Sequence, residues 1–274
     1  MAMVVDGKGS VSVEDPPITV VLGSPEALFG VHSVTGTSSD TRGAMATGDW
    51  LCDSDGRTVY GALGVFIDTA IGSPAVAHRP AGGWAVTTDL SVTFGAAPEV
   101  GGGDLRSAGR TVLADHRSAI SEGEVVNPSG ELVAKVVERL LFTPDQSISD
   151  DHVPVGSIDR GSWDGMTLLG GVRHNDAILL DVGRLSLNPA GALHGGIAVY
   201  LSERSASAIV DERVEGLTPT ALQVSYIRPG RAGSRLIFRC VPVHMGRNSA
   251  VVKVESRTLA GKICTVATVT YHRR

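Results

Sequence analysis

Two mainly apolar stretches of the chain are each interrupted by one carboxylate near the middle. The first is GALGVFIDTAIGSP at 61–74, which contains Asp68, and the second is GIAVYLSERSASAI at 196–209, which contains Glu203. Stretches of this length without period-two alternation predict helices of roughly four turns. Apolar side chains on most sides of the first stretch predict that its helix is buried.

Each predicted helix is followed by a series of strand candidates, in which apolar and polar positions alternate or β-branched residues accumulate. Turn sequences such as PEVGGG, NPSG and LAG separate them. The candidates lie at 84–94, 104–115, 118–126 and 131–142, then at 220–229, 234–243, 249–258 and 262–272, and shorter ones precede the helices at 18–23 and 178–187. A buried helix followed by a meander of long strands predicts a curved antiparallel sheet wrapped around that helix.

The second half of the chain repeats the first. Three segments match in order, at offsets of 135, 132 and 131 residues: 61–74 with 196–209, 89–94 with 221–226, and 116–134 with 247–265. Between the halves, TPDQSISDDHVPVGS is rich in Asp, Ser and Pro and lacks apolar periodicity. We therefore predict two domains, 1–148 and 149–274.

Composition narrows the classes of protein that the chain can represent. The net charge is −5, and no Lys/Arg cluster suggests a nucleic-acid partner. The three cysteines are widely spaced and form no CxxC, which indicates a reducing compartment and gives no metal-site signal. The amino-terminal residues lack the apolar core of a signal peptide, and no apolar run approaches the ~20 residues that span a bilayer. We expect a cytoplasmic protein without a membrane span.

The second half carries a family motif. The His194-Gly195-Gly196 turn, the following helix with its carboxylate, and the pattern T-x-x-L-x-V-x-[FY]-x-x-P, in which Pro219 replaces the Thr, resemble the hotdog-fold thioesterases, in particular the branch of the phenylacetate-pathway and 4-hydroxybenzoyl-CoA thioesterases. The likeness occurs once in each half, so that together the two copies extend over nearly the whole chain. It implies an α+β double hotdog, in which each repeat wraps a curved antiparallel sheet around a long helix and the two sheets join as an intrachain pseudo-dimer. The first half departs from the motif with Val59-Tyr60-Gly61.

The thioesterase resemblance implies a carboxylate that acts beside the Gly195 amide. Helix geometry argues against Glu203 in that role. Glu203 lies eight residues after Gly195, which separates their Cα atoms by ~12 Å along a helix. A glutamate side chain reaches only about 5 Å. If the two helices lie antiparallel across a pseudo-twofold interface, the start of one faces the second or third turn of the other. We therefore expect Asp68 of the first half to meet Gly195 of the second.

The resemblance implies an acyl-CoA thioesterase that acts in lipid metabolism, with one complete site. Asp68 would act as general base or as nucleophile, and both routes stay open. The Gly195 amide at a helix N-terminus would stabilise the oxyanion. Around them, His194 and Asn188 would orient the loop or the thioester, and Thr87 would stand beside the acid. A second, degenerate site would contain Glu203, Ser207, Tyr60 and Gly61.

Substrate contacts and partners follow from the same resemblance. Gly196 and Ser249 are candidate substrate-binding residues, and Arg117 and Arg247 are candidates for the coenzyme A phosphates, with ordinary solvated turn arginines as the alternative. We expect no metal and no redox cofactor, since coenzyme A is part of the acyl-CoA substrate. A second copy of the chain is a candidate partner.

Two other functions remain open from the sequence. The first is a non-catalytic acyl-CoA-binding or regulatory protein that kept the fold. The second is a hydratase, which is a weaker reading because the first half has no histidine near Asp68 in the sequence.

Overall fold

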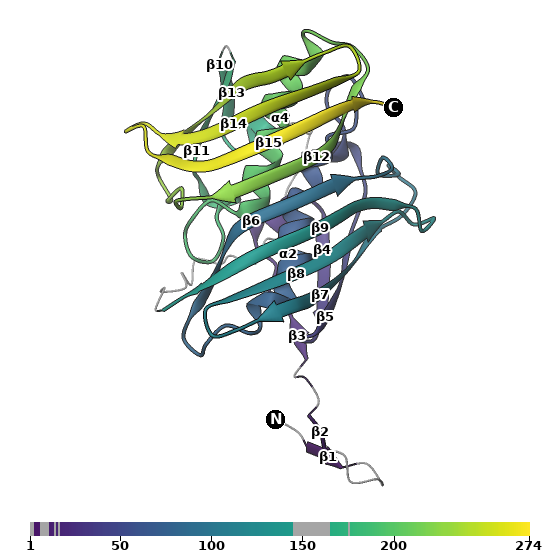
Figure 1. The fold of residues 1–274 in the computed structure, drawn as a ribbon, viewed down its shortest axis with the longest axis vertical. Helices are drawn as coiled ribbons and strands as arrows, with labels where there is room; N and C mark the ends of the chain where they lie inside the picture. Colours follow the sequence, from purple (N-terminus) through teal and green to yellow (C-terminus); the bar gives the residue numbers. More distant parts are fainter. Residues whose placement is uncertain (1–2, 6–10, 14, 16, 145–164, 175) are drawn as a thin grey trace.

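The computed structural model describes residues 3–5, 11–13, 15, 17–144, 165–174 and 176–274. The predicted domain boundary at 148/149 lies outside the described residues. The amino-terminal strands β1 (Met3–Val5) and β2 (Val11–Val13) pair only with each other. All other strands belong to one antiparallel sheet (Figure 1).

The two halves contain the same elements in the same order. Among the described residues, each has a short helix and a β-hairpin, then 3₁₀ turns (two in the first half and one in the second) and a long helix, and ends with four long strands. In the first half these are α1 (Ser24–Leu28), β4 (Val31–Gly36), β5 (Asp40–Met45), α2 (Gly64–Val76), β6 (Trp84–Phe94), β7 (Leu105–Ala114), β8 (Ser118–Val126) and β9 (Leu132–Thr143). In the second half they are α3 (Gly165–Leu168), β10 (Gly171–His174), β11 (Ala177–Asp181), α4 (Gly195–Asp211), β12 (Leu217–Tyr226), β13 (Arg235–Met245), β14 (Ser249–Thr258) and β15 (Ile263–Arg273).

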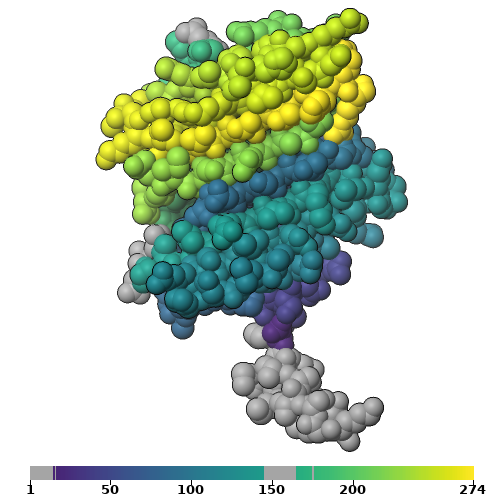
Figure 2. All heavy atoms as spheres, viewed as in Figure 1, coloured from purple at the N-terminus to yellow at the C-terminus, as the bar shows by residue number. Residues whose placement is uncertain are grey.

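The large sheet is continuous across both halves. Its strand order is β10-β11-β13-β14-β15-β12-β6-β9-β8-β7-β5-β4-β3, where β3 is Ile18–Thr19. The halves join where β12 pairs antiparallel with β6, for example through Leu222 and Val92. Figure 2 shows the green-to-yellow second half adjoining the blue-to-teal first half along this line. The strand order of one half therefore mirrors that of the other.

The two long helices lie against the sheet, and the hydrophobic core lies between the helices and the sheet. All but two of the 13 residues of α2 are buried, Asp68 and Val76 being the exceptions. Such a helix, apolar on nearly every side, is stable only when protein surrounds it. Asp68 is thus one of the few polar groups that this helix presents, and its position matters for the site.

The structure confirms the predicted helices and the eight long strands to within a few residues at their ends. It also shows the hairpin β4–β5, which we did not predict, because VHSVTG and DTRGAM are short and carry no clear apolar alternation. The candidate at 178–187 is a strand only to Asp181 and then contains a 3₁₀ turn at Arg184–Ser186. In the described part of the chain, no helix is long and apolar enough to cross a membrane.

Candidate functional site

The two long helices cross antiparallel at their amino-terminal turns, where glycine permits very close contact. A Cβ atom on Gly196 would lie 2.4 Å from backbone atoms of Gly64 and Val65, and a Cβ on Gly64 would lie 2.4 Å from the Gly196 carbonyl oxygen. Gly195 packs on the Asp68 carboxylate in the same way, since its Cβ would lie 2.8 Å from Oδ1. Only glycine fits these positions without moving the helices apart. The crossing therefore brings the second turn of α2 to the start of α4.

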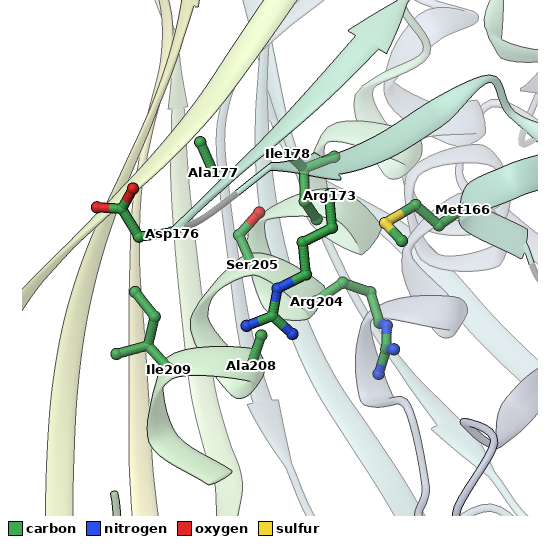
Figure 3. A pocket seen from close by; sticks show the side chains of 9 residues that line it. All are labelled: Met166, Arg173, Asp176, Ala177, Ile178, Arg204, Ser205, Ala208 and Ile209. Carbon is green, nitrogen blue, oxygen red and sulfur yellow. The ribbon is translucent and has the colours of Figure 1, made fainter. Parts of the chain in front are cut away.

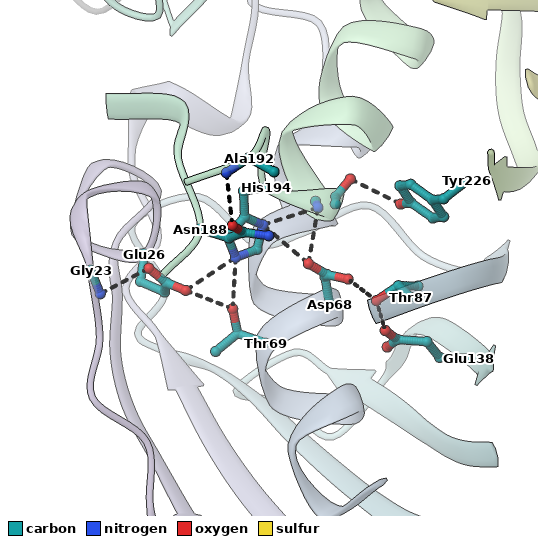
Figure 4. Close-up of polar contacts among 12 residues, drawn as sticks. Gly23, Glu26, Asp68, Thr69, Thr87, Glu138, Asn188, Ala192, His194 and Tyr226 are labelled. Carbon is teal, nitrogen blue, oxygen red and sulfur yellow. Dashed lines mark hydrogen bonds and ion pairs between the residues drawn. The ribbon is translucent and has the colours of Figure 1, made fainter. Parts of the chain in front are cut away.

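Asp68 accepts hydrogen bonds at the amino-terminus of α4 (Figure 4). The Gly196 amide donates to Asp68 Oδ2 at 3.1 Å, and the Thr87 hydroxyl of β6 lies 3.2 Å from Oδ1. A β-bulge between Thr87 and Asp89 interrupts the register of β6 at this point. The structure thus brings together Asp68, Thr87 and the His-Gly-Gly turn, although the amide that Asp68 contacts belongs to Gly196 and not to Gly195. The free amino-terminal amides and the helix dipole favour an anion here.

The amide of Gly195 is the first of the helix amides of α4. Among the described residues it has no hydrogen-bond acceptor, whereas its carbonyl accepts from the Tyr226 hydroxyl of β12 at 2.9 Å. Burial, followed by the negative charge of Asp68, raises the pKa of Tyr226 well above its usual value. Tyr226 therefore stays a neutral donor that fixes the first peptide of α4. The unoccupied amide is a suitable donor for an oxyanion.

His194 caps α4 and is buried between two carboxylates. Its Nδ1 lies 3.1 Å from Asp68 Oδ2 and 3.1 Å from the Gly196 amide nitrogen. Its Nε2 lies 3.1 Å from Oε1 of Glu26, which α1 of the first half supplies. Burial acts against protonation of the imidazole, but the charge of Asp68 and the hydrogen bond and charge of Glu26 outweigh it and raise the pKa of His194.

A third carboxyl group, that of Glu138 on β9, lies beside Asp68. The Thr87 hydroxyl is 2.7 Å from Glu138 Oε1, and Gly72 of α2 leaves the space that the carboxyl group fills. Glu138 is 1% exposed, so burial, and then the charge of Asp68, raises its pKa well above the usual value. A neutral Glu138 can donate its proton to Thr87 while Thr87 donates to Asp68. This chain of donors ends at Asp68, which accepts.

Asn188 forms the loop that leads into His194. Its Oδ1 accepts from the amides of Ala190 and Ala192, at 3.0 and 3.1 Å. Asp53 makes the same turn in the first half, where its Oδ1 accepts from Asp55 and Arg57. The repeat that matches these two positions is therefore also a structural repeat. Only the amide nitrogen of Asn188 is left to face a substrate.

All of these groups border one large cavity of about 1100 Å³. Asp68, Thr87, Glu138, Asn188, His194 and Gly195 all line it. Apolar side chains from the end of α2 and its C-cap, from β6 and from β9 line another part, namely Val76, Ala77, Trp84, Val86, Leu140 and Leu141. The exposed arginines Arg79, Arg228 and Arg231 also line it. The cavity thus combines carboxylates, an unused helix amide, apolar walls and cationic groups in a volume typical of ligand sites.

The second set of predicted residues forms a closed core and borders neither this cavity nor the smaller hollow described next. Glu203 is 2% exposed and accepts from the Ser207 hydroxyl, which also lies 3.0 Å from the Tyr271 hydroxyl. A Cβ on Gly61 would lie 3.2 Å from Glu203 Oε2, so the two halves meet here as they do at Asp68. The Tyr60 ring is buried, and its centroid lies 5.1 Å from that of Phe94.

A small hollow near the outer side of α4 has room for only about one water molecule (Figure 3). Its volume is about 30 Å³, and Arg173, Asp176 and Arg204 are among the residues around it. It lies apart from the catalytic candidates. Among the described residues, no cluster of three or more His, Cys, Asp or Glu side chains is arranged to hold a metal ion.

The structure does not support the predicted substrate contacts in the strand turns. Arg117 precedes β8 and Arg247 precedes β14, and neither of them, nor Ser249, borders the large cavity. Gly196 contacts Asp68 and Gly64, so its place is in the helix contact.

Sequence reasoning missed Glu26, Glu138 and Tyr226. Glu138 could have been found, because it lies two residues from both Val136 and Leu140 along β9. It is therefore on the same inward-facing side of the strand and faces the core. Tyr226 occupies the aromatic position of the family motif. Glu26 gives no such signal beyond its capping interaction with the Gly23 amide.

Comparisons with known proteins agree with this architecture. The family model of the acyl-CoA thioesterase N-terminal domain matches residues 184–272, and that of the acyl-CoA thioesterase C-terminal domain matches residues 25–142. The two domain types thus occur here in the reverse of the order that their names suggest. Together the matches cover both long helices and all eight long strands except the ends of β9 and β15.

Individual relatives were found by sequence and by structure. Proteins named "Putative esterase" from Haemophilus influenzae and Deinococcus radiodurans are 33% and 29% identical over 94 and 93 residues. These matches cover 33% and 34% of this chain, and 67% and 63% of the relatives. The solved structure of acyl-CoA thioesterase II from Mycobacterium marinum has a TM-score of 0.62 at 12% identity, with 91% of this chain and 97% of that chain covered. At that identity, the structure shows the shared fold.

The fold and the two domain matches define a thioester hydrolase of hotdog type. The chain belongs to the hotdog-fold acyl-CoA thioesterases.

Proposed function

We propose that the protein hydrolyses acyl-CoA thioesters at a single site, formed across the contact between two hotdog repeats of one chain. The observation that supports this most directly is the Asp68 carboxylate beside the unoccupied Gly195 amide, in a cavity of about 1100 Å³. Asp68 comes from the first repeat and Gly195 from the second. The chain is then an intrachain pseudo-dimer, or double hotdog.

The chemistry follows from the two groups. The Gly195 amide polarises the thioester carbonyl and binds the oxyanion that forms when the carbon is attacked. Asp68 either takes a proton from an attacking water or attacks directly to give an anhydride, which water then opens. In both routes the C–S bond breaks, the thiolate of coenzyme A leaves, and the acid product is released. His194, Thr87 and Glu138 hold Asp68 in place for this attack.

The substrate orientation that we propose uses the two kinds of cavity wall. The acyl chain would lie against the apolar side chains from α2, β6 and β9. The phosphates of coenzyme A would meet the exposed Arg228 and Arg231 from the loop after β12, and Arg79 after α2. These arginines donate to backbone carbonyls and, within the described residues, form no ion pair with a carboxylate. They remain available to bind phosphate.

We propose that the second site is inactive. A bound thioester needs space, and Glu203 lies packed against Gly61, Ser207 and the buried Tyr60. At the matching loop, Asp53 is 3.7 Å from Arg204 of α4. Apolar packing and ion pairs therefore occupy the space where the first site holds its cavity.

The hydratase reading was the weaker one because the first half has no histidine near Asp68 in the sequence, but the fold brings one to Asp68 from the other half. His194 of the other half lies 3.1 Å from Asp68. However, Glu26 engages the second ring nitrogen, so His194 is not a free base. A control assay of enoyl-CoA hydration should therefore show no turnover.

The experiment that tests this function is the hydrolysis of a panel of acyl-CoAs by the wild type, Asp68→Asn and Glu203→Gln. We expect Asp68→Asn to lower kcat by roughly three orders of magnitude or more, while Glu203→Gln retains kcat. The reverse pattern would contradict the site assignment. Absence of turnover by the wild type on every thioester would favour a non-catalytic acyl-CoA-binding protein.

A further inference from the structure

Glu26 is a buried carboxylate that lies behind the His-Gly-Gly turn. It receives hydrogen bonds from three directions: the Gly23 amide at 2.9 Å, the Thr69 hydroxyl at 3.0 Å and His194 Nε2 at 3.1 Å. Its side chain is 9% exposed and that of His194 is 7% exposed. A buried carboxylate surrounded by donors is stable as an anion. Glu26 therefore presents a negative charge to one nitrogen of the imidazole.

The other nitrogen of His194 faces a second anion. The Gly196 amide donates to both His194 Nδ1 and Asp68 Oδ2, at 3.1 Å each, and Nδ1 itself lies 3.1 Å from Oδ2. If Nδ1 had no proton, two acceptors would face each other and share a single N–H. A proton on Nδ1 removes this repulsion and lets both Nδ1–H and Gly196 N–H donate to Asp68. The geometry is thus satisfied by an imidazolium between two carboxylates.

The two repeats of the chain provide an independent comparison. Glu26 lies four residues before Gly30, the positive-φ glycine that ends α1, and Met166 lies four residues before the equivalent Gly170 after α3. His194 corresponds to Val59. The repeat contact that lacks a cavity therefore has an apolar residue at both positions, and the contact with the cavity has the ion pair. The pair is associated with the site that can bind substrate.

We propose that Glu26 is a positioning residue that keeps His194 protonated between two carboxylates, and that this imidazolium holds Asp68 against the start of α4. The proposal rests on the proposed function of the Asp68 site. Glu26 acts through His194 and takes no part in bond making. Its removal would leave the fold of the cavity in place but would leave Asp68 misaligned with the Gly195 amide.

The charged and polar groups around this imidazole come from five elements. Glu26 lies on α1, Asp68 and Thr69 lie on α2, Thr87 on β6, Glu138 on β9 and Tyr226 on β12. Glu26 and Asp68 are the two charges that raise the pKa of His194. Burial resists ionisation of Glu26, but the hydrogen bond and charge of His194, with the amides of Glu26 and Gly23, lower its pKa to about 2.

The direct test is a ¹⁵N NMR titration of the histidine side chains in the full chain, with His194 assigned from the spectrum of His194→Gln. We expect both ring nitrogens of His194 to be protonated at pH 7 and above in the wild type. In Glu26→Gln the ring should become neutral at lower pH, because one of its two carboxylates is lost. A neutral His194 in the wild type at pH 7 would overturn the proposal, and this measurement needs no turnover.

The kinetic test compares Glu26→Gln with Glu212→Gln, which removes a carboxylate from an exposed ion pair with Arg173. Glu26→Gln should lower kcat roughly tenfold with KM nearly unchanged, and should shift the pH profile of kcat. Glu212→Gln should leave both as in the wild type. An unchanged kcat in a folded Glu26→Gln would show that Glu26 does not position the site. If no thioester is hydrolysed at all, the proposed function fails while the NMR result still stands or falls by itself.

Discussion

The buried carboxyl group of Glu203 should make the stability of the folded protein fall as pH rises. Burial is the largest influence on Glu203; it outweighs the Ser207 hydrogen bond and the nearby Arg204 and raises the pKa from 4.5 to about 7. One pKa unit corresponds to about 1.4 kcal/mol. Ionising Glu203 therefore costs about 3 kcal/mol more in the folded protein than in the unfolded chain.

The sign of this effect follows from proton binding. Below pH 4.5 both states hold the proton, and Glu203 has no influence on the free energy of unfolding. Between pH 4.5 and about 7 the folded state keeps a proton that the unfolded state has lost, so the free energy of unfolding decreases. Above that range the full cost of about 3 kcal/mol applies. Glu203→Gln has no charge to bury and should escape this loss.

Urea unfolding of the wild type and Glu203→Gln, at intervals from pH 5 to 8, measures the difference. The stability advantage of Glu203→Gln should grow by between about 2 and 3 kcal/mol over that range. The same exchange at the exposed Glu131 is the matched control and should give a difference that does not depend on pH. A difference for Glu203→Gln that stays flat with pH would refute the argument that Glu203 is neutral in the folded core.

Two further substitutions test the contacts of the cavity. The raised pKa of Glu138 favours its neutral form, so Glu138→Gln should keep the Thr87 contact and change kcat by less than about threefold. Glu138→Ala loses that contact and should lower kcat about tenfold or more. A large loss of kcat in Glu138→Gln at pH 7 would mean that the carboxyl group has to ionise. Replacing Arg228 and Arg231 by alanine should raise KM for acyl-CoA about tenfold and leave hydrolysis of acyl-N-acetylcysteamine, which lacks phosphates, unchanged. Arg117→Ala is the control for these arginines, and an equal loss on both thioesters would argue against phosphate binding.

Much of the fold could be predicted because its signals are local. The 61–74 and 196–209 stretches and the eight long strands carry their periodicity in the sequence, and these segments form the helices and strands that the structure shows. The hairpin β4–β5 could not be predicted, because its short strands pair through contacts that their own sequence does not reveal.

The sequence by itself predicted that any acid acting with Gly195 comes from outside its own helix, because a helix rises by a fixed distance per residue. The repeat then pointed to Asp68. Only the tertiary structure decided how that acid is held, since a buried charge depends on neighbours that are distant in sequence. Glu26 lies 168 residues from its partner His194, and Glu138 lies 51 residues from Thr87. Hydrophobic periodicity cannot predict such pairs, because it indicates only which face of an element is buried.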